Sequence, residues 1–203
     1  MTGWPEDAAT VAVVAPRQPT WDALALAMAG CTACPLAGSR QRVVPGACPP
    51  QAQLLLVGEA PGRSEDEGGL PFIGRSGRLL DALLDDVGLV RNELAVVNTV
   101  KCRPPGNRTP RRLETGTCRP WLDAQVDVVD PAVVLTLGGT ALAWALGPGL
   151  RIGEVHGSVH NVAGRSVVPT YHPSAALRFG PSGPPAQALR SDLAVVARLV
   201  GAG

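Results

Sequence analysis

The sequence is short of the features that would assign it to several specialised classes. Its longest apolar runs, such as DPAVVLTL and SDLAVVARLV, are short or interrupted by charge, so we expect no transmembrane helix. The segment MTGWPEDAAT lacks the basic start and apolar core of a secretion signal, which favours a cytoplasmic location. Aromatic residues make up only 3% of the chain, so an aromatic residue in a loop is informative.

The remaining composition is that of an ordinary globular protein. The chain has 203 residues, of which 45% are hydrophobic and 17% charged, and its formal net charge of +1 points to no particular partner. This length is sufficient for one sizeable core. We therefore expect residues 1–203 to form one domain, with residues 1–20 as a poorly ordered N-terminal extension.

Apolar strands alternate with amphipathic segments along the chain. This alternation is typical of an α/β protein whose parallel sheet is covered by helices on both faces. The pattern predicts strands at 52–58, 94–100, 132–138 and 165–171. It predicts helices at 21–30, 76–89, 118–129, 139–147 and 186–200.

Three unusual segments lie at or beside the carboxyl ends of these strands. GEAPG follows the first strand, NTVKCRPPGNRTP spans the end of the second, and YHPSAALR begins at the end of the fourth. In open α/β sheets, ligands bind outside the carboxyl ends of the strands. We therefore expect the three segments to converge on one site.

The five cysteines are more consistent with metal or redox chemistry than with disulfides, because their number is odd and no secretion signal is visible. Cys31 and Cys34 form a C-x-x-C pair, and Cys102 and Cys118 supply two further thiols for a four-ligand site, which leaves Cys48 as a spare. The spacing alone does not separate zinc from an iron–sulfur cluster. A redox pair and buried thiols acting as small hydrophobic side chains are the alternatives.

A run of basic residues follows the second predicted strand. Residues 101–119 contain one acidic residue, Glu114. Their basic residues are Lys101, Arg103, Arg108, Arg111, Arg112 and Arg119. Such a basic patch is either a phosphate contact or the solvated face of a helix.

The motifs and the cysteine spacing together resemble the iron–sulfur-containing family 4 uracil-DNA glycosylases. The matching motifs are GEAPGRSEDEGGLPFIGRSGRLL, NTVKCRPPGNRTP and YHPSAALR, and the match covers roughly residues 21–200 by order and spacing. The resemblance implies a three-layer α/β/α sandwich around a four-stranded parallel sheet. It also implies a [4Fe-4S] cluster held by Cys31, Cys34, Cys102 and Cys118, and a monomer that removes uracil from DNA by cleaving the N-glycosidic bond.

The resemblance also assigns residues to the base pocket. An enzyme that acts on a base must take it out of the stack and read its hydrogen-bonding edge. Phe72 would stack on the flipped uracil, with anchoring of a loop into the core as the alternative. The Asn98 amide offers a donor and an acceptor for uracil O4 and N3–H, although a strand-end Asn is by itself more often a turn residue. The implied substrate-binding set is Gly58, Ala60, Pro61, Gly62, Phe72 and Asn98.

Two residues are candidates for the chemical step. His172 resembles the histidine that donates to uracil O2 as negative charge builds on the leaving base. Glu59 is the candidate carboxylate beside the sugar, where positive charge develops. Better-known uracil-DNA glycosylases carry an Asp one position further along this loop, where this chain has Ala60, so Glu65 and Asp66 are alternatives to Glu59.

DNA contacts are expected from Arg108, Arg111, Arg112 and Arg178. The first three would meet the DNA backbone, and Arg178 lies where the family inserts a side chain at the minor groove.

Two alternatives to a glycosylase remain. A covalent uracil-DNA trap is disfavoured because NRTPRRLETGTC contains no histidine nucleophile. A metal-stabilised nucleic-acid-binding domain without chemistry leaves the three motifs unexplained.

Overall fold

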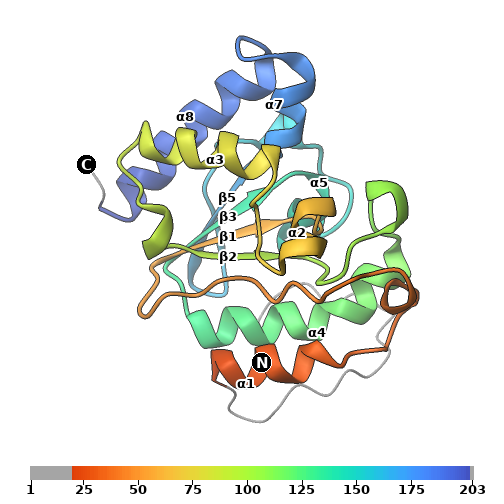
Figure 1. The fold of residues 1–203 in the computed structure, drawn as a ribbon. Coiled ribbons are helices and arrows are strands. Elements are labelled where there is room, and N and C mark those ends of the chain that lie inside the picture. Colours follow the sequence, from red (N-terminus) through yellow and green to blue (C-terminus); the bar gives the residue numbers. More distant parts are fainter. Residues whose placement is uncertain (1–19, 202–203) are drawn as a thin grey trace.

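A computed structural model of the protein describes residues 20–201, and a five-stranded β-sheet lies at its centre (Figure 1). The strands are β1 (Leu54–Gly58), β2 (Ala95–Asn98), β3 (Val133–Leu137), β4 (His160–Val162) and β5 (Arg165–Thr170). Their order across the sheet is β2-β1-β3-β5-β4, and all neighbours are parallel except β4 and β5. All residues of β1, β2 and β3 are buried, as expected for strands covered on both faces.

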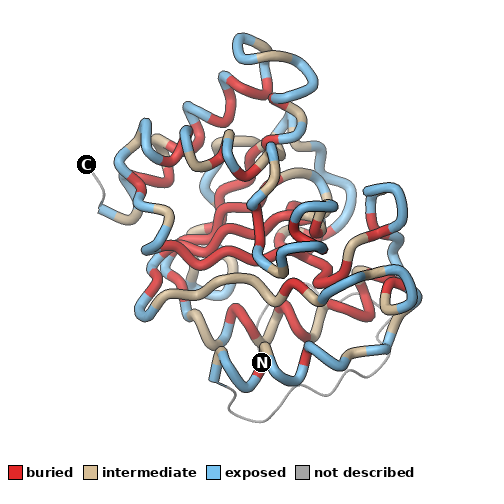
Figure 2. The backbone as a smooth tube through the Cα atoms, in the orientation of Figure 1, coloured by how far each residue is buried: buried red, intermediate tan, exposed pale blue. Residues whose placement is uncertain are grey.

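Helices cover both faces of the sheet and make the fold a three-layer sandwich (Figure 1). One apolar core joins the sheet to α3 (Arg75–Asp85), α7 (Pro173–Phe179) and α8 (Pro184–Leu199). A second core joins the opposite face to α4 (Arg112–Val129) and α5 (Gly139–Leu146). The outer helix α1 (Trp21–Ala29) packs on α4 through a third, smaller cluster. Figure 2 shows that the buried residues are concentrated in the central sheet and on the sides of the helices that pack against the sheet.

The structure confirms the predicted α/β sandwich and its four parallel strands, and it adds the short antiparallel strand β4 at the edge. Helix α4 begins at Arg112, six residues before the predicted start. Sequence reasoning did not predict the short helices α2 (Arg63–Gly68), α6 (Ile152–Val155) and α7, nor the 3-10 turns η1 (Pro35–Gly38), η2 (Arg91–Glu93) and η3 (Pro105–Asn107). Apart from Thr20, which caps α1, the expected N-terminal extension lies outside the described residues. Within residues 20–201, no helix is long and apolar enough to cross a membrane.

Candidate functional site

The three unusual segments converge on one pocket of about 610 Å³ at the carboxyl edge of the parallel strands. This volume is typical of small-molecule sites. The first segment contributes residues 59–65, Phe72 and residues 74–76, the second contributes Asn98 and residues of the following loop, and the third contributes His172 and residues of α7. Among the lining residues are Glu59, Phe72, Asn98, Arg108, His172 and Arg178. The sequence therefore identified the segments that form the pocket, and the roles of the individual residues remain predictions.

Phe72 forms one wall of the pocket in a backbone conformation that is unusual for its residue type. Its φ is +56°, in the left-handed region that L-residues with bulky side chains rarely adopt. Arg91 restrains the loop, because its guanidinium lies 5.9 Å from the centre of the Phe72 ring and donates to the carbonyl of Pro71 at 3.1 Å. Strained conformations of this kind persist where the surrounding structure fixes them and are concentrated at functional sites.

Gly58 lies at the end of β1, beneath Phe72 and Asn98. A Cβ at this position would lie 2.4 Å from Asn98 Oδ1 and 2.6 Å from the Phe72 ring. Only glycine therefore allows the ring and the amide to approach the strand this closely.

Asn98, the last residue of β2, has an unsatisfied acceptor in the pocket. Its side chain is almost fully buried, and its Oδ1 has no hydrogen-bond partner among residues 20–201. Leaving a buried acceptor unpaired costs about 1–3 kcal/mol. A ligand N–H that reached this oxygen would remove the penalty, so the geometry favours a ligand that presents a donor.

His172 is half-buried at the N-cap of α7, and its ring centre lies 5.9 Å from that of Phe72. The backbone N–H of Ser174 donates to His172 Nδ1 at 3.2 Å, so Nδ1 is an acceptor. Burial lowers the pKa of His172 to about 4, and the negative charge of Glu65 only partly opposes this. The imidazole is therefore neutral near pH 7 and carries its proton on Nε2, which donates to no side chain or main-chain group among residues 20–201.

Glu59 is anchored at the rim of the pocket. Its Oε2 accepts a 2.6 Å hydrogen bond from the hydroxyl of Thr140, in the first turn of α5. Its backbone carbonyl accepts from the hydroxyl of Thr99. The two alternative carboxylates, Glu65 and Asp66, are instead buried and accept hydrogen bonds from main-chain N–H groups. Glu59 is thus the acidic residue of this segment whose carboxylate is held by a side-chain hydroxyl.

The arginines predicted to bind DNA differ in their surroundings. Arg108 lines the pocket, but its guanidinium makes two hydrogen bonds of 2.8 and 2.6 Å to the buried carboxylate of Glu114. This pairing lowers the pKa of Glu114. Arg111 and Arg112 are exposed where α4 begins, and Arg178 is exposed on α7 at the pocket.

The prediction of a basic patch was wrong for one of its residues, Lys101. Lys101, the only lysine of the chain, is buried, and its Nζ donates to the backbone carbonyl of Asn98 at 2.5 Å. Burial lowers the pKa of Lys101 to about 8. Arg119 is only half-buried and pairs with Asp123, one turn further along α4. The patch is therefore narrower than the sequence indicated.

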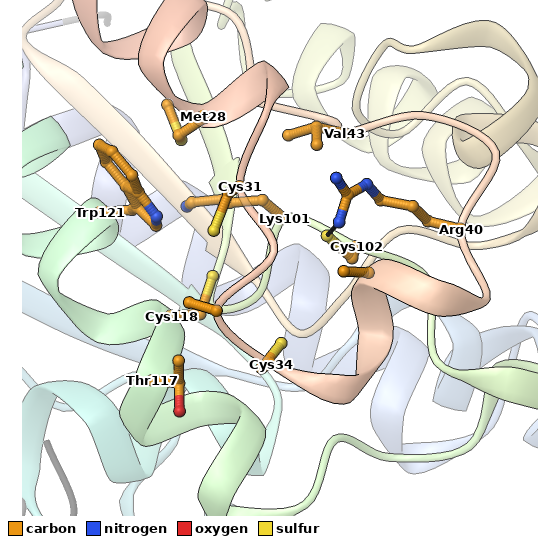
Figure 3. Close-up of a pocket in the computed structure, with 12 residues that line it drawn as sticks. Met28, Cys31, Cys34, Arg40, Val43, Lys101, Cys102, Thr117, Cys118 and Trp121 are labelled. Carbon is orange, nitrogen blue, oxygen red and sulfur yellow. Dashed lines mark hydrogen bonds between the residues drawn. The ribbon is translucent and has the colours of Figure 1, made fainter. Parts of the chain in front are cut away.

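Four of the five cysteines surround a second pocket, on the α1 and α4 side of the molecule (Figure 3). Cys31 and Cys34 follow α1, Cys102 lies in the loop after β2, and Cys118 lies on α4. Cys48 is not among the lining residues. The thiols come from segments far apart in the sequence, as the spacing predicted.

Apolar and basic side chains complete the cysteine pocket. Met28, Val43 and Trp121 supply apolar walls, and Figure 3 shows Lys101 and Arg40 beside the thiols. The Arg40 guanidinium donates to Cys102 Sγ at 3.5 Å. Within residues 20–201, no group of three Cys, His, Asp or Glu side chains is arranged to hold a single metal ion.

Burial raises the pKa of Cys102 to about 11 and that of Cys118 to about 12. Without a metal, both thiols are therefore protonated at neutral pH. Thiolates are the species that bind metals, so metal binding at this pocket would release protons.

Sequence reasoning missed three polar contacts that support the pocket. These are the hydrogen bond of Thr140 to Glu59, that of Lys101 to Asn98, and the contacts of Arg91 with the Phe72 loop. No local pattern identifies them, because each joins elements that the fold brings together. The one available signal was that Lys101 lies within the motif NTVKCRPPGNRTP.

The structure thus combines a parallel sheet, a pocket of about 610 Å³ at the carboxyl edge of its strands, and a second pocket lined by four cysteines. Residues 45–193 match the family model described as the uracil DNA glycosylase superfamily. The chain belongs to this superfamily.

Individual relatives place the chain more narrowly within the superfamily. A type-4 uracil-DNA glycosylase of Thermotoga maritima is 43% identical over 150 residues, which are 73% of this chain and 78% of that protein. A type-4 uracil-DNA glycosylase of Sulfurisphaera tokodaii is 40% identical over 159 residues, with 72% and 71% covered. A type-5 uracil-DNA glycosylase of Mycobacterium leprae is 35% identical over 165 residues, with 68% and 70% covered.

Proposed function

We propose that the protein is a uracil-DNA glycosylase that hydrolyses the N-glycosidic bond of deoxyuridine in DNA and so starts base excision repair. The observation that carries the proposal is the buried, unpaired Oδ1 of Asn98 in a pocket that also contains Phe72 and His172. Uracil presents an N–H donor at N3, which matches this acceptor, whereas cytosine has an acceptor at that position.

The residues of the pocket suggest how the reaction proceeds. Phe72 would stack on the flipped base while Asn98 reads its edge. As the glycosidic bond breaks, the bonding electrons move to the uracil ring, and the Nε2–H of neutral His172 would donate to the developing negative charge at O2. Glu59, oriented by Thr140, would stabilise the positive charge on the sugar and position the attacking water.

We also propose that the cysteine pocket holds a [4Fe-4S] cluster. The donor set fits, because four thiols line one apolar pocket with two basic side chains beside them. Each thiolate of a cubane cluster binds a different iron, so these ligands need not converge on one point as they would around a single ion. When bound, the cluster would supply iron–thiolate bonds that join the end of α1, the loop after β2, and α4.

The decisive experiment is a uracil-release assay with oligonucleotides that contain U:G, U:A or single-stranded uracil. We expect free uracil and an alkali-labile abasic site. A stable protein–DNA adduct would instead support the covalent alternative, and tight binding without release would support a binding domain without chemistry. The structure offers no histidine for the adduct in the basic segment, and His156 pairs with Asp192 of α8.

Replacing Asn98 with Asp is expected to weaken discrimination for uracil. The carboxylate puts an acceptor where the amide would donate to O4, while the acceptor for N3–H is kept. We expect a fall in uracil excision of about 10- to 100-fold, as for the loss of one buried hydrogen bond worth about 1–3 kcal/mol. Single-turnover excision on uracil- and cytosine-containing DNA measures the effect. Unchanged uracil release would count against Asn98 as the reader.

Replacing Arg111 and Arg112 together with Ala is expected to weaken binding to uracil-containing and undamaged DNA by similar factors. Phosphate contacts carry no sequence information, and the salt dependence of binding should flatten by roughly one unit of slope for each phosphate that the variant no longer neutralises. Binding titrations at several salt concentrations measure this, and excision at saturating DNA should change little. If the variant keeps the parent's slope, this part of α4 is a solvated face.

The matched comparison for this pair is Arg108→Ala. Arg108 makes two hydrogen bonds to buried Glu114, so its loss leaves a buried carboxylate without its cation. We therefore expect this variant to lower the melting temperature. A fall in melting temperature confined to the double variant would reverse this assignment.

A further inference from the structure

We infer that Glu65 is a positioning residue whose carboxylate holds together the two loops that form the walls of the base pocket. The inference rests on the proposed function, because it assigns Phe72 to base stacking. Glu65 itself does not act on the substrate. It acts through the main chain of the residues on either side of the pocket.

The carboxylate of Glu65 bridges two separate loops. Its Oε2 accepts from the backbone N–H of Gly62 at 3.1 Å, in the loop that follows β1. Its Oε1 accepts from the backbone N–H of Gly74 at 2.8 Å, two residues after Phe72. A single side chain of α2 therefore sets the spacing between the GEAPG loop and the Phe72 loop.

The site of this bridge is closely fitted. Glu65 is 9% exposed, and a Cβ on Gly62 would lie 2.8 Å from its Oε2, so a larger residue at 62 would displace the carboxylate. Within residues 20–201, no Arg, Lys or His forms an ion pair with Glu65. Both carboxylate oxygens are thus used on the main chain of the pocket.

The Phe72 loop needs such a restraint because Phe72 has a left-handed backbone conformation. Arg91 fixes the loop on the N-terminal side, at the Pro71 carbonyl, and Glu65 fixes it on the C-terminal side, at Gly74. Without the second anchor, the loop can relax toward an ordinary conformation and move the ring. A displacement of about 1 Å is enough to slow a catalytic step by about 100-fold.

The next residue, Asp66, provides a matched control in the same short helix. It is also buried, and its Oδ1 also accepts from two backbone N–H groups, those of Gln41 at 2.9 Å and Arg42 at 3.3 Å. These groups belong to the segment that follows η1 and Arg40, not to the base pocket. The two carboxylates therefore have the same chemistry and hold different parts of the molecule.

The test compares Glu65→Gln with Asp66→Asn. Each amide keeps the size of its side chain. In Glu65→Gln one of the two accepting oxygens becomes a donor that faces a main-chain N–H, whereas Asp66→Asn can keep an oxygen at the position of Oδ1, which alone accepts from both N–H groups. Thermal unfolding, iron content and single-turnover excision at saturating uracil-containing DNA are measured for both. We expect a loss of melting temperature that is no larger for Asp66→Asn than for Glu65→Gln. At a temperature where both variants are folded, we expect a fall in the excision rate of about 10- to 100-fold for Glu65→Gln and a change of less than about threefold for Asp66→Asn.

The outcomes separate this inference from the proposed function. If the parent protein releases no uracil, the proposed function fails. If the parent is active and both variants lose excision to the same extent, or Glu65→Gln loses none, the positioning role is overturned. Should Glu65→Gln not fold, Glu65→Asp replaces it, because the shorter side chain keeps both acceptors but cannot span both loops. Undiminished excision by that variant would equally overturn the inference.

Discussion

Replacing His172 with Ala is expected to lower single-turnover excision at saturating uracil-containing DNA by about 100- to 1,000-fold, as for the loss of one oxyanion donor. The hydrogen bond from Nε2–H strengthens as negative charge develops on the leaving base, so its loss affects the chemical step more than binding. Rapid-quench measurement of the abasic product gives the rate. DNA affinity should change by less than about threefold.

His160→Ala is the matched control, because His160 lies on the edge strand β4 and contacts Ser158 outside the pocket. Its excision rate should equal that of the parent. Equal rates for the His172 variant and the parent would remove His172 from the mechanism. A large loss in the His160 variant would show that the assay reports folding instead of chemistry.

The pH dependence of the parent tests the protonation state of His172. Its pKa is about 4 in the folded protein against an ordinary value of 6.5, so the unfolded chain binds a proton in this interval that the folded protein does not. The contribution of His172 to stability is therefore complete above pH 6.5 and is lost as the pH falls toward 4. We expect no inflection from His172 in the excision rate between pH 5.5 and 8. An inflection near pH 6.5 that His172→Ala abolishes would contradict a neutral imidazole donor.

The sequence was sufficient to predict the sheet and the location of the pocket. Buried parallel strands appear as continuous apolar runs, and the ends of such strands lie at one edge, so β1, β2, β3 and β5 and the convergence of their loops could be predicted from local patterns. The short strand β4 was missed because its three residues, HNV, carry no apolar run. It forms because β5 offers an open edge.

The supporting contacts of the site could not be predicted, for a physical reason. A lysine or glutamate in a motif loop is by default solvated, and only tertiary structure shows that Lys101 and Glu65 are buried against main-chain groups. The same applies to Arg108, which looks like a phosphate ligand in the sequence and is tied to Glu114 in the fold. Motif residues that would face the substrate can be identified by resemblance, whereas residues that hold them in place require the structure.

Replacing Cys118 with Ser is expected to remove iron and to lower stability far more than it alters the chemical step. Cys118 and Cys102 are buried in the small cluster that joins α1 to α4, so their metal bonds would link the outer helix and the loop after β2 to the body of the protein. If these bonds contribute about 5 kcal/mol to folding, their loss lowers the melting temperature by about 10–20 °C.

Protein prepared without oxygen should be brown and contain about four irons per chain, and the Cys118 variant should be colourless. Metal analysis, visible absorbance and thermal unfolding measure these effects, and excision at saturating DNA well below the lowered melting temperature should stay within about tenfold of the parent. Cys48→Ala is the control, because Cys48 lies outside the cysteine pocket and its loss should leave the iron content unchanged. Zinc in place of iron in the anaerobic preparation would refute the cluster. A structural link can slow the chemistry only by loosening the fold. A loss of excision by the Cys118 variant without a loss of stability would therefore give the cysteine pocket a direct part in the reaction.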